Sequence, residues 1–153
     1  MQGLEFDALP YYRESPHPSE EYPLLVFTGE RDDEYLQSRH GFTPELRKRR
    51  PEPKFFLNSK DAAELNIDKD EWIFIKNKAG KIKGIAEIRN DMPQGVVRAP
   101  HDWWKPETKQ GKYFLSSALE LSYAQLTLDE EGYIGTEQGI PHLRGLPCRV
   151  EKA

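Results

Sequence analysis

The sequence has little of what disulfide bonding, membrane insertion or export requires. Its 153 residues include one cysteine, Cys148, which excludes an intramolecular disulfide and a zinc or iron–sulfur site made of four thiolates within the chain. No apolar run approaches the roughly 20 residues that a membrane-spanning helix needs. The opening residues lack the basic and apolar stretches of a secretory signal peptide. These absences predict a reduced, soluble chain of one domain.

The common motifs of catalysis are absent as well. There is no GxGxxG or GxxxxGK[ST] phosphate loop and no GxSxG nucleophile elbow. The four histidines, at positions 17, 40, 101 and 142, share no i, i+4 spacing and have no cysteine neighbour, so the sequence does not indicate a zinc site. We interpret Cys148 as a small buried apolar side chain and not as a nucleophile. The sequence therefore predicts no catalytic residue and no metal ligand.

Positive and negative charges are nearly balanced. The 22 Lys and Arg residues against 26 Asp and Glu residues give a net charge of −4, which argues against nucleic acid or an anionic membrane as a partner. The basic run Arg47–Arg50 could bind phosphate, but it is typical of the solvated C-terminal end of a helix. The acidic run Asp32–Glu34 could serve acid–base or metal chemistry. A solvated loop is the favoured interpretation of that run.

The apolar pattern predicts short strands and two short helices. One helix is expected to start at Thr43-Pro44 and to stop before Pro51. The other is expected over Asp61–Leu65, with Asn58 or Ser59 as its cap. Strands are expected at Leu24–Phe27, Lys54–Leu57, Trp72–Lys76, Lys81–Arg89, Val96–Ala99 and Pro147–Glu151.

The connections between these elements favour a mostly-β barrel whose loops carry the function. The four-residue turn Asn77–Gly80 predicts a hairpin. From His101 to Gly139 no regular period is visible. Residues 1–22 are rich in Pro, Glu and Tyr, which predicts a linker laid over a surface. Because this linker opens the chain, we expect Met1 to be a cut inside a longer polypeptide.

Four segments in a fixed order carry a resemblance to a known family. They are LPYYRESPHPSEEYPLLVFTGERDDEYLQSRH, PEPKFFLNSKDAAELNIDKDEWIFIKNKAGKIKGIAEI, MPQGVVRAPHDWW and GIPHLRGLPCRV. Together they resemble the C-terminal domain of the molybdenum and tungsten oxidoreductases that carry a molybdopterin guanine dinucleotide. This family includes formate dehydrogenases, thiosulfate and polysulfide reductases and dimethyl sulfoxide reductase. The resemblance covers nearly the whole chain.

The resemblance implies a double-psi β-barrel with a few short helices and long loops, covering residues 23–153 after a linker at residues 1–22. In the family this is the fourth domain of the catalytic subunit, and it closes over the pterin dinucleotides. The metal and its protein ligand belong to earlier domains, so this domain is not catalytic alone. The expected partners are those domains, with an iron–sulfur electron-transfer subunit as a further candidate. The preceding part of the subunit would decide the substrate and the compartment, cytoplasmic or periplasmic.

The resemblance places the first cofactor contacts directly after the first strand. Thr28-Gly29 matches the family's Thr-Gly, where backbone amides approach a phosphate or ribose. Glu30 and Arg31 follow, whereas the family usually has arginine directly after the glycine. A second match is Ser38-Arg39-His40, in which Arg39 offers a fork for phosphate and His40 a donor or acceptor.

Two further matches have a structural alternative. Asn58 and Asp61 match the family's Asn-Pro-x-Asp-Ala, although Ser59 replaces the proline. Their polar groups could bind a guanine edge, or they could only cap a helix. The segment with His101 and Trp103 matches a His-Gly-Trp-Trp stretch near the pterin, where aromatic packing alone would also explain the tryptophan.

The last matches lie near the C-terminus. Ser122 and Gln125 lie in a segment where the family usually reads Asn-x-Asn-x-Leu-Thr. Both asparagines are absent, because Ser122 and Ala124 stand in their places and Gln125 follows. Arg144 occupies the place of a family lysine and could bind cofactor oxygens or lie exposed. The alternative function is a free-standing double-psi barrel that recognises a substrate or partner, because a fold alone does not determine function.

Overall fold

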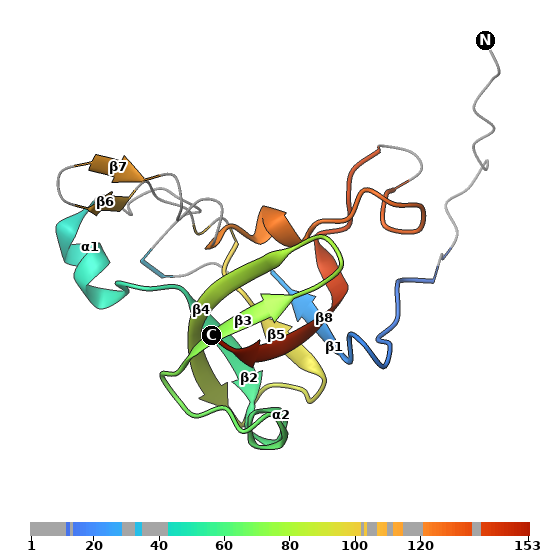
Figure 1. Cartoon of the computed structure of the whole chain (residues 1–153), viewed down its shortest axis with the longest axis horizontal. Helices are drawn as coiled ribbons and strands as arrows, with labels where there is room; N and C mark the ends of the chain where they lie inside the picture. The colour runs from blue at the N-terminus through green and yellow to red at the C-terminus, as the bar shows by residue number, and fades with distance from the viewer. Residues whose placement is uncertain are drawn as a thin grey trace, which may run out of the picture.

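The computed structural model describes residues 12, 14–28, 33–34, 43–101, 103, 107–109, 112–114, 121–135 and 139–153. Within these residues the centre of the molecule is a closed barrel (Figure 1). In order around the barrel its strands are β1 (Leu24–Phe27), β5 (Val96–Arg98), β2 (Lys54–Asn58), β4 (Lys81–Arg89), β3 (Trp72–Lys76) and β8 (Arg144–Lys152).

Parallel and antiparallel pairs alternate irregularly around this barrel. β1 pairs with β5 and β2 with β4 in parallel, whereas β2–β5, β3–β4, β3–β8 and β1–β8 are antiparallel. The predicted hairpin is confirmed, because β3 and β4 pair in register and the amide of Asn77 donates to the carbonyl of Gly80 across the turn. The expected mostly-β barrel with short helices is therefore confirmed.

Alternating residues of each strand fill the barrel, as a closed sheet requires. On β3, Ile73 and Ile75 are fully buried. Gly84 of β4 lies under the ring of Phe55, where a Cβ atom would be 2.7 Å from the ring, so only glycine leaves room for this buried aromatic. Cys148 is fully buried, which raises the pKa of its thiol to about 12 and confirms it as an apolar core residue.

Both predicted helices are confirmed. α1 (Pro44–Arg49) begins after Thr43, whose side chain makes no capping hydrogen bond. α2 (Ser59–Glu64) is capped by Asn58, whose Oδ1 accepts a 2.8 Å hydrogen bond from the amide of Lys60. The choice between Asn58 and Ser59 as cap is thereby decided for Asn58.

The structure departs from the sequence-based expectations near the C-terminus. β8 begins at Arg144, three residues before the expected strand. The prediction missed this start because Gly145 interrupts the apolar pattern, whereas the structure accommodates Gly145 within the strand at φ 69°. A short hairpin, β6 (Glu107–Lys109) and β7 (Lys112–Phe114), and a 3-10 helix, η1 (Tyr123–Leu126), lie where no period was visible.

The described part of the opening segment is tied to the barrel at its end. The carboxylate oxygen Oε1 of Glu21 lies 3.7 Å from a guanidinium nitrogen of Arg149 in β8. The same guanidinium lies over the Tyr22 ring, 5.9 Å from the ring centre. Residues 14–19 form no helix or strand. This contact agrees with a segment laid over a surface, while the role of residues 1–22 as an interdomain linker stays a prediction. Among the described helices, none is long and apolar enough to cross a membrane.

Candidate functional site

Those predicted site residues that the structure describes divide between the two ends of the barrel. Figure 1 shows the strands that lead to each end. β1 and β5 run in the same direction, and β2 runs against them. The end reached by the C-terminal ends of β1 and β5, which also carries η1 and the start of β8, is called the upper end here. The lower end carries α2 and the turn at residues 91–95 that precedes β5.

The upper end brings several predicted residues together. Thr28 directly follows β1, and the carbonyl of its neighbour Phe27 accepts a 2.9 Å hydrogen bond from Ala99, two residues before His101. Arg144 starts β8 and pairs in register with Phe27. The Oη of Tyr123 in η1 donates a 3.3 Å hydrogen bond to a β1 carbonyl, that of Val26. The ends of β1, β5 and β8 and the helix η1 therefore meet.

The Thr28 side chain has the clearest feature of a binding group. Thr28 is 7% exposed, and among the described residues no atom forms a hydrogen bond with its Oγ1. A buried hydroxyl without a partner costs about 1–3 kcal/mol. A polar group of a bound ligand would remove that cost, so this residue fits a cofactor contact.

Ser122 and Gln125 belong to the same end because they adjoin η1. Ser122 is the N-cap of η1, and its carbonyl accepts a 3.0 Å hydrogen bond from the amide of Gln125. Both residues are half-buried. Trp103 is buried, and the Arg47 guanidinium of α1 lies 5.5 Å from its ring centre. Trp103 thus has a packing role, whereas its contact with a pterin stays a prediction.

Asn58 and Asp61 lie at the lower end and hold the turn before β5. The Nδ2 of Asn58 donates a 2.5 Å hydrogen bond to the carbonyl of Met92. The Oδ2 of Asp61 accepts a 2.8 Å hydrogen bond from the amide of Gly95, whose φ is 75°. The helix-capping alternative is confirmed for Asn58. The guanine contact stays a prediction for both residues.

The structure does not bring this pair together with Thr28. β5 lies between Gly95, which Asp61 binds, and Ala99, which is bonded to the residue before Thr28. At about 3.3 Å per residue, these four steps separate the two groups by roughly 13 Å. A single small ligand group cannot contact both of them.

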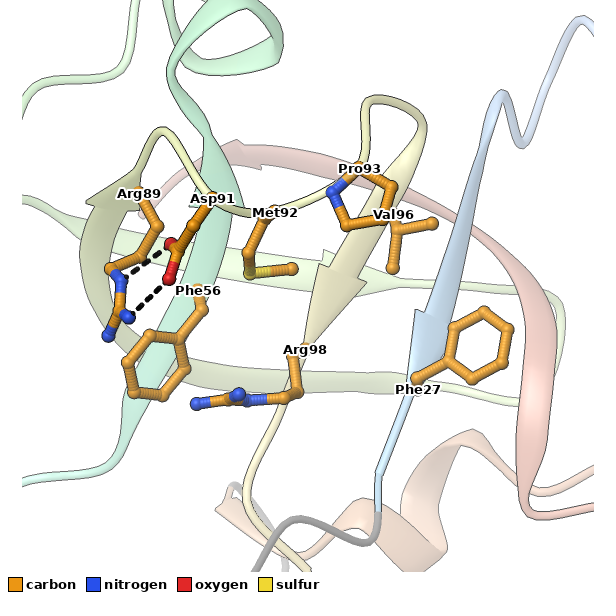
Figure 2. Close-up of a pocket in the computed structure, with 8 residues that line it drawn as sticks. All are labelled: Phe27, Phe56, Arg89, Asp91, Met92, Pro93, Val96 and Arg98. Atoms are coloured by element: carbon orange, nitrogen blue, oxygen red, sulfur yellow. Dashed lines mark hydrogen bonds and ion pairs between the residues drawn. The ribbon is translucent and has the colours of Figure 1, made fainter.

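A shallow pocket of about 280 Å³ lies on the outer face of β1, β5 and β2 (Figure 2). Phe27, Arg98 and Phe56 stand in one cross-strand row, and the Arg98 guanidinium lies 4.0 Å from the centre of the Phe56 ring. Burial lowers the pKa of Arg98, although an arginine remains charged at neutral pH. At the edge of the pocket, Arg89 donates two hydrogen bonds to the carboxylate of Asp91.

Sequence reasoning missed this row of side chains. Phe27 and Phe56 were interpreted only as parts of apolar strands, and Arg98 was given no role. The signal lies in the pairing register of three strands that are distant in the sequence, and a single sequence does not provide that register.

The two charge clusters are less solvated than expected. The expectation of a fully solvated basic run is wrong for Arg50, whose side chain is 12% exposed and lies 3.8 Å from Glu34. Its guanidinium also lies 5.7 Å from the ring of Phe56. Lys48 and Arg49 are exposed, as expected. Arg50 and Glu34 therefore form an ion pair, and the guanidinium groups of Arg47 and Arg50 lie against aromatic rings.

Six of the predicted site residues lie outside the described part of the chain. They are Gly29, Glu30, Arg31, Ser38, Arg39 and His40. Their contacts with a cofactor stay predictions.

Comparisons with known proteins point to one family. The pattern of the Molydopterin dinucleotide binding domain matches residues 25–131. Acetylene hydratase of Syntrophotalea acetylenica is 34% identical over 153 residues, which cover 95% of this chain and 21% of the relative. Dopamine dehydroxylase of Eggerthella lenta is 37% identical over 151 residues, covering 95% of this chain and 14% of that relative.

A solved structure agrees with the sequence comparisons. Acetylene hydratase from Pelobacter acetylenicus superimposes with a TM-score of 0.87 and 31% identity, over 97% of this chain and 22% of that protein. The chain thus spans about a fifth of one relative and about a seventh of another. In these relatives the same barrel is one domain of a much larger chain.

Proposed function

Because this chain belongs to the molydopterin dinucleotide binding domain family, we propose that its upper end closes over a molybdopterin guanine dinucleotide. The single observation that carries this placement is the buried Thr28 Oγ1, which has no partner among the described residues and lies where β1, β5, β8 and η1 meet. The cofactor supplies the redox or hydration chemistry when bound, and the chain supplies binding, orientation and electrostatics.

The residues of the upper end suit this division of labour. The Thr28 hydroxyl would donate to a phosphate or pterin oxygen, and the Arg144 guanidinium would face cofactor oxygens. Ser122, in the place of a family asparagine, and the nearby Gln125 would add neutral hydrogen bonds. His101 would lie near the pterin. None of these groups needs to act as an acid, base or nucleophile.

The assignment extends to a larger protein. We propose that residues 23–153 form the cofactor-capping domain of a molybdenum or tungsten enzyme and that residues 1–22 join it to the preceding domain. The names of the two relatives denote different reactions, those of a hydratase and a dehydroxylase, whereas the matching family pattern denotes binding of a dinucleotide, which supports a role for the barrel in cofactor binding. Substrate choice would then lie in the other domains, and an iron–sulfur subunit would be a further partner.

Calorimetry with guanosine diphosphate and adenosine diphosphate tests the proposal on this chain. We expect weak binding of guanosine diphosphate, because the rest of the cofactor's cradle lies in other domains, and weaker binding of adenosine diphosphate. Equal affinities would exclude recognition of guanine. A barrel that only recognises a protein or substrate would bind neither nucleotide.

A further inference from the structure

The turn between β3 and β4 contacts η1 and the segment that follows it. The turn covers Asn77–Gly80, and η1 lies against β4 at the upper end (Figure 1). Three residues of the turn contact this region, and the contacts of Asn77 and Gly80 are described below. The third is Lys78, whose Nζ donates a 2.7 Å hydrogen bond to the carboxylate of Glu130, four residues after η1. This ion pair is exposed and therefore weak. The position of η1 is therefore determined by the contacts of Asn77 and Gly80.

Asn77 forms a hydrogen bond between its own turn and η1. It is 8% exposed, and its Nδ2 donates a 2.7 Å hydrogen bond to the carbonyl of Leu126, the last residue of η1. Its Oδ1 accepts hydrogen bonds from the amides of Ala79 at 2.9 Å and Gly80 at 3.1 Å. One side chain thus shapes its own turn and fixes the end of η1, and aspartate could not reproduce this because it lacks the Nδ2 donor.

Gly80 sets how closely the turn approaches η1. A Cβ atom at this position would lie 2.6 Å from the carbonyl oxygen of Gln125. That oxygen belongs to the backbone, so it cannot move without displacing η1. Any larger residue at position 80 therefore pushes Gln125 away from β4.

Tyr123 bonds η1 to β1 as well. Tyr123 is 2% exposed, and its Oη bonds the carbonyl of Val26, two residues before Thr28. Burial raises the pKa of this hydroxyl, so it stays a neutral donor. η1 is thus bonded both to the β3–β4 turn and to β1, which fixes Ser122 and Gln125 relative to Thr28.

We propose that Asn77 and Gly80 are positioning residues for dinucleotide binding, which act by holding η1 so that Ser122 and Gln125 face the same ligand as Thr28. This inference rests on the proposed function. It assigns a binding role to a turn that touches no cofactor itself and that the sequence identifies only as a hairpin connection.

The test is calorimetry with guanosine diphosphate on Asn77→Asp and Gly80→Ala. We expect each variant to bind about tenfold more weakly, as expected when one hydrogen bond of about 1.4 kcal/mol is misplaced. Two controls repeat the chemical changes elsewhere. Asn90→Asp makes the same change at an exposed position, and Gly135→Ala adds a Cβ that would meet its nearest neighbour only at 3.6 Å.

A third control distinguishes a displacement of η1 from a general loss of fold stability. Ile67→Ala removes a buried side chain next to α2 at the lower end, so it lowers the melting temperature without removing a hydrogen bond that holds η1. Reduced affinity in the two turn variants, with unchanged affinity in all three controls below their melting temperatures, would support the proposal. Amide hydrogen exchange of Gln125 and Thr127 should accelerate in the same two variants alone.

The outcomes distinguish this inference from the proposed function. Wild-type affinity in both turn variants would overturn the positioning role and leave the proposed function intact. A comparable loss of affinity in Ile67→Ala would overturn the positioning role as well, because it would show that binding follows stability. No binding of guanosine diphosphate by the unchanged chain would overturn both.

Discussion

Asn58 and Asp61 at the lower end of the barrel and Thr28 at the upper end are buried polar residues that differ in how their side chains are bonded. At the lower end, Asn58 and Asp61 direct their side chains to backbone groups of the same chain. At the upper end, Thr28 is equally buried, yet its Oγ1 has no partner among the described residues. Since an unmatched buried hydroxyl costs free energy, the difference separates side chains that stabilise the fold from a hydroxyl whose cost a bound ligand would remove.

Asn58→Ala should have the largest effect on stability of the changes that test this comparison. It removes the cap of α2 and leaves the carbonyl of Met92 without its donor, so we expect a loss of about 2–3 kcal/mol. Urea denaturation measures this loss, and Asn90→Ala at an exposed position is the control. If Asn58 only builds the fold, affinity for guanosine diphosphate stays unchanged below the melting temperature.

Asp61→Asn should have an intermediate effect of about 1–2 kcal/mol, because it replaces a charge-assisted hydrogen bond to the amide of Gly95 by a neutral one. Denaturation together with calorimetry divides the two roles of this residue. Lost stability with retained nucleotide affinity would assign Asp61 to the turn alone. A selective loss of affinity for guanosine over adenosine diphosphate would instead support the guanine contact and break the comparison.

Thr28→Val should change stability by less than about 1 kcal/mol, because it replaces a hydroxyl that has no partner by a methyl group of similar size. We expect nucleotide affinity to fall instead, which is the reverse of the result at Asn58. Thermal denaturation and calorimetry on the same sample give both values. A marked loss of stability would show that Thr28 Oγ1 is already bonded, and the upper end would then lose its main evidence.

Most strands and both helices could be predicted because their signals are local. The hairpin turn at Asn77 and the Thr43-Pro44 helix start are examples. β8 was predicted too short because Gly145 breaks the apolar alternation, whereas the strand is held by its pairing with β1 and β3.

The site was less predictable than the fold for a similar reason. Asn58 and Thr28 were both expected to contact the cofactor because both matched family positions, but β2 runs against β1 and carries Asn58 to the other end. The hydrogen bond from Asn77 to the carbonyl of Leu126 joins positions 49 residues apart. Neither fact follows from local periodicity, since both depend on strand order.

The weakest expected effect concerns pH at the rim of the outer pocket. The paired hydrogen bonds from Arg89 hold the pKa of the Asp91 carboxyl below its usual range. A lowered pKa in the folded state stabilises the fold above the usual carboxyl pKa, and this contribution is lost as the pH falls through the folded value. Both side chains are largely exposed, so solvent screens the pair and the slope should be shallow. Carbon-detected NMR titration of Asp91, with Arg89→Gln as the comparison, measures the shift. An Asp91 pKa unchanged by that substitution would show that the pair does not persist in solution.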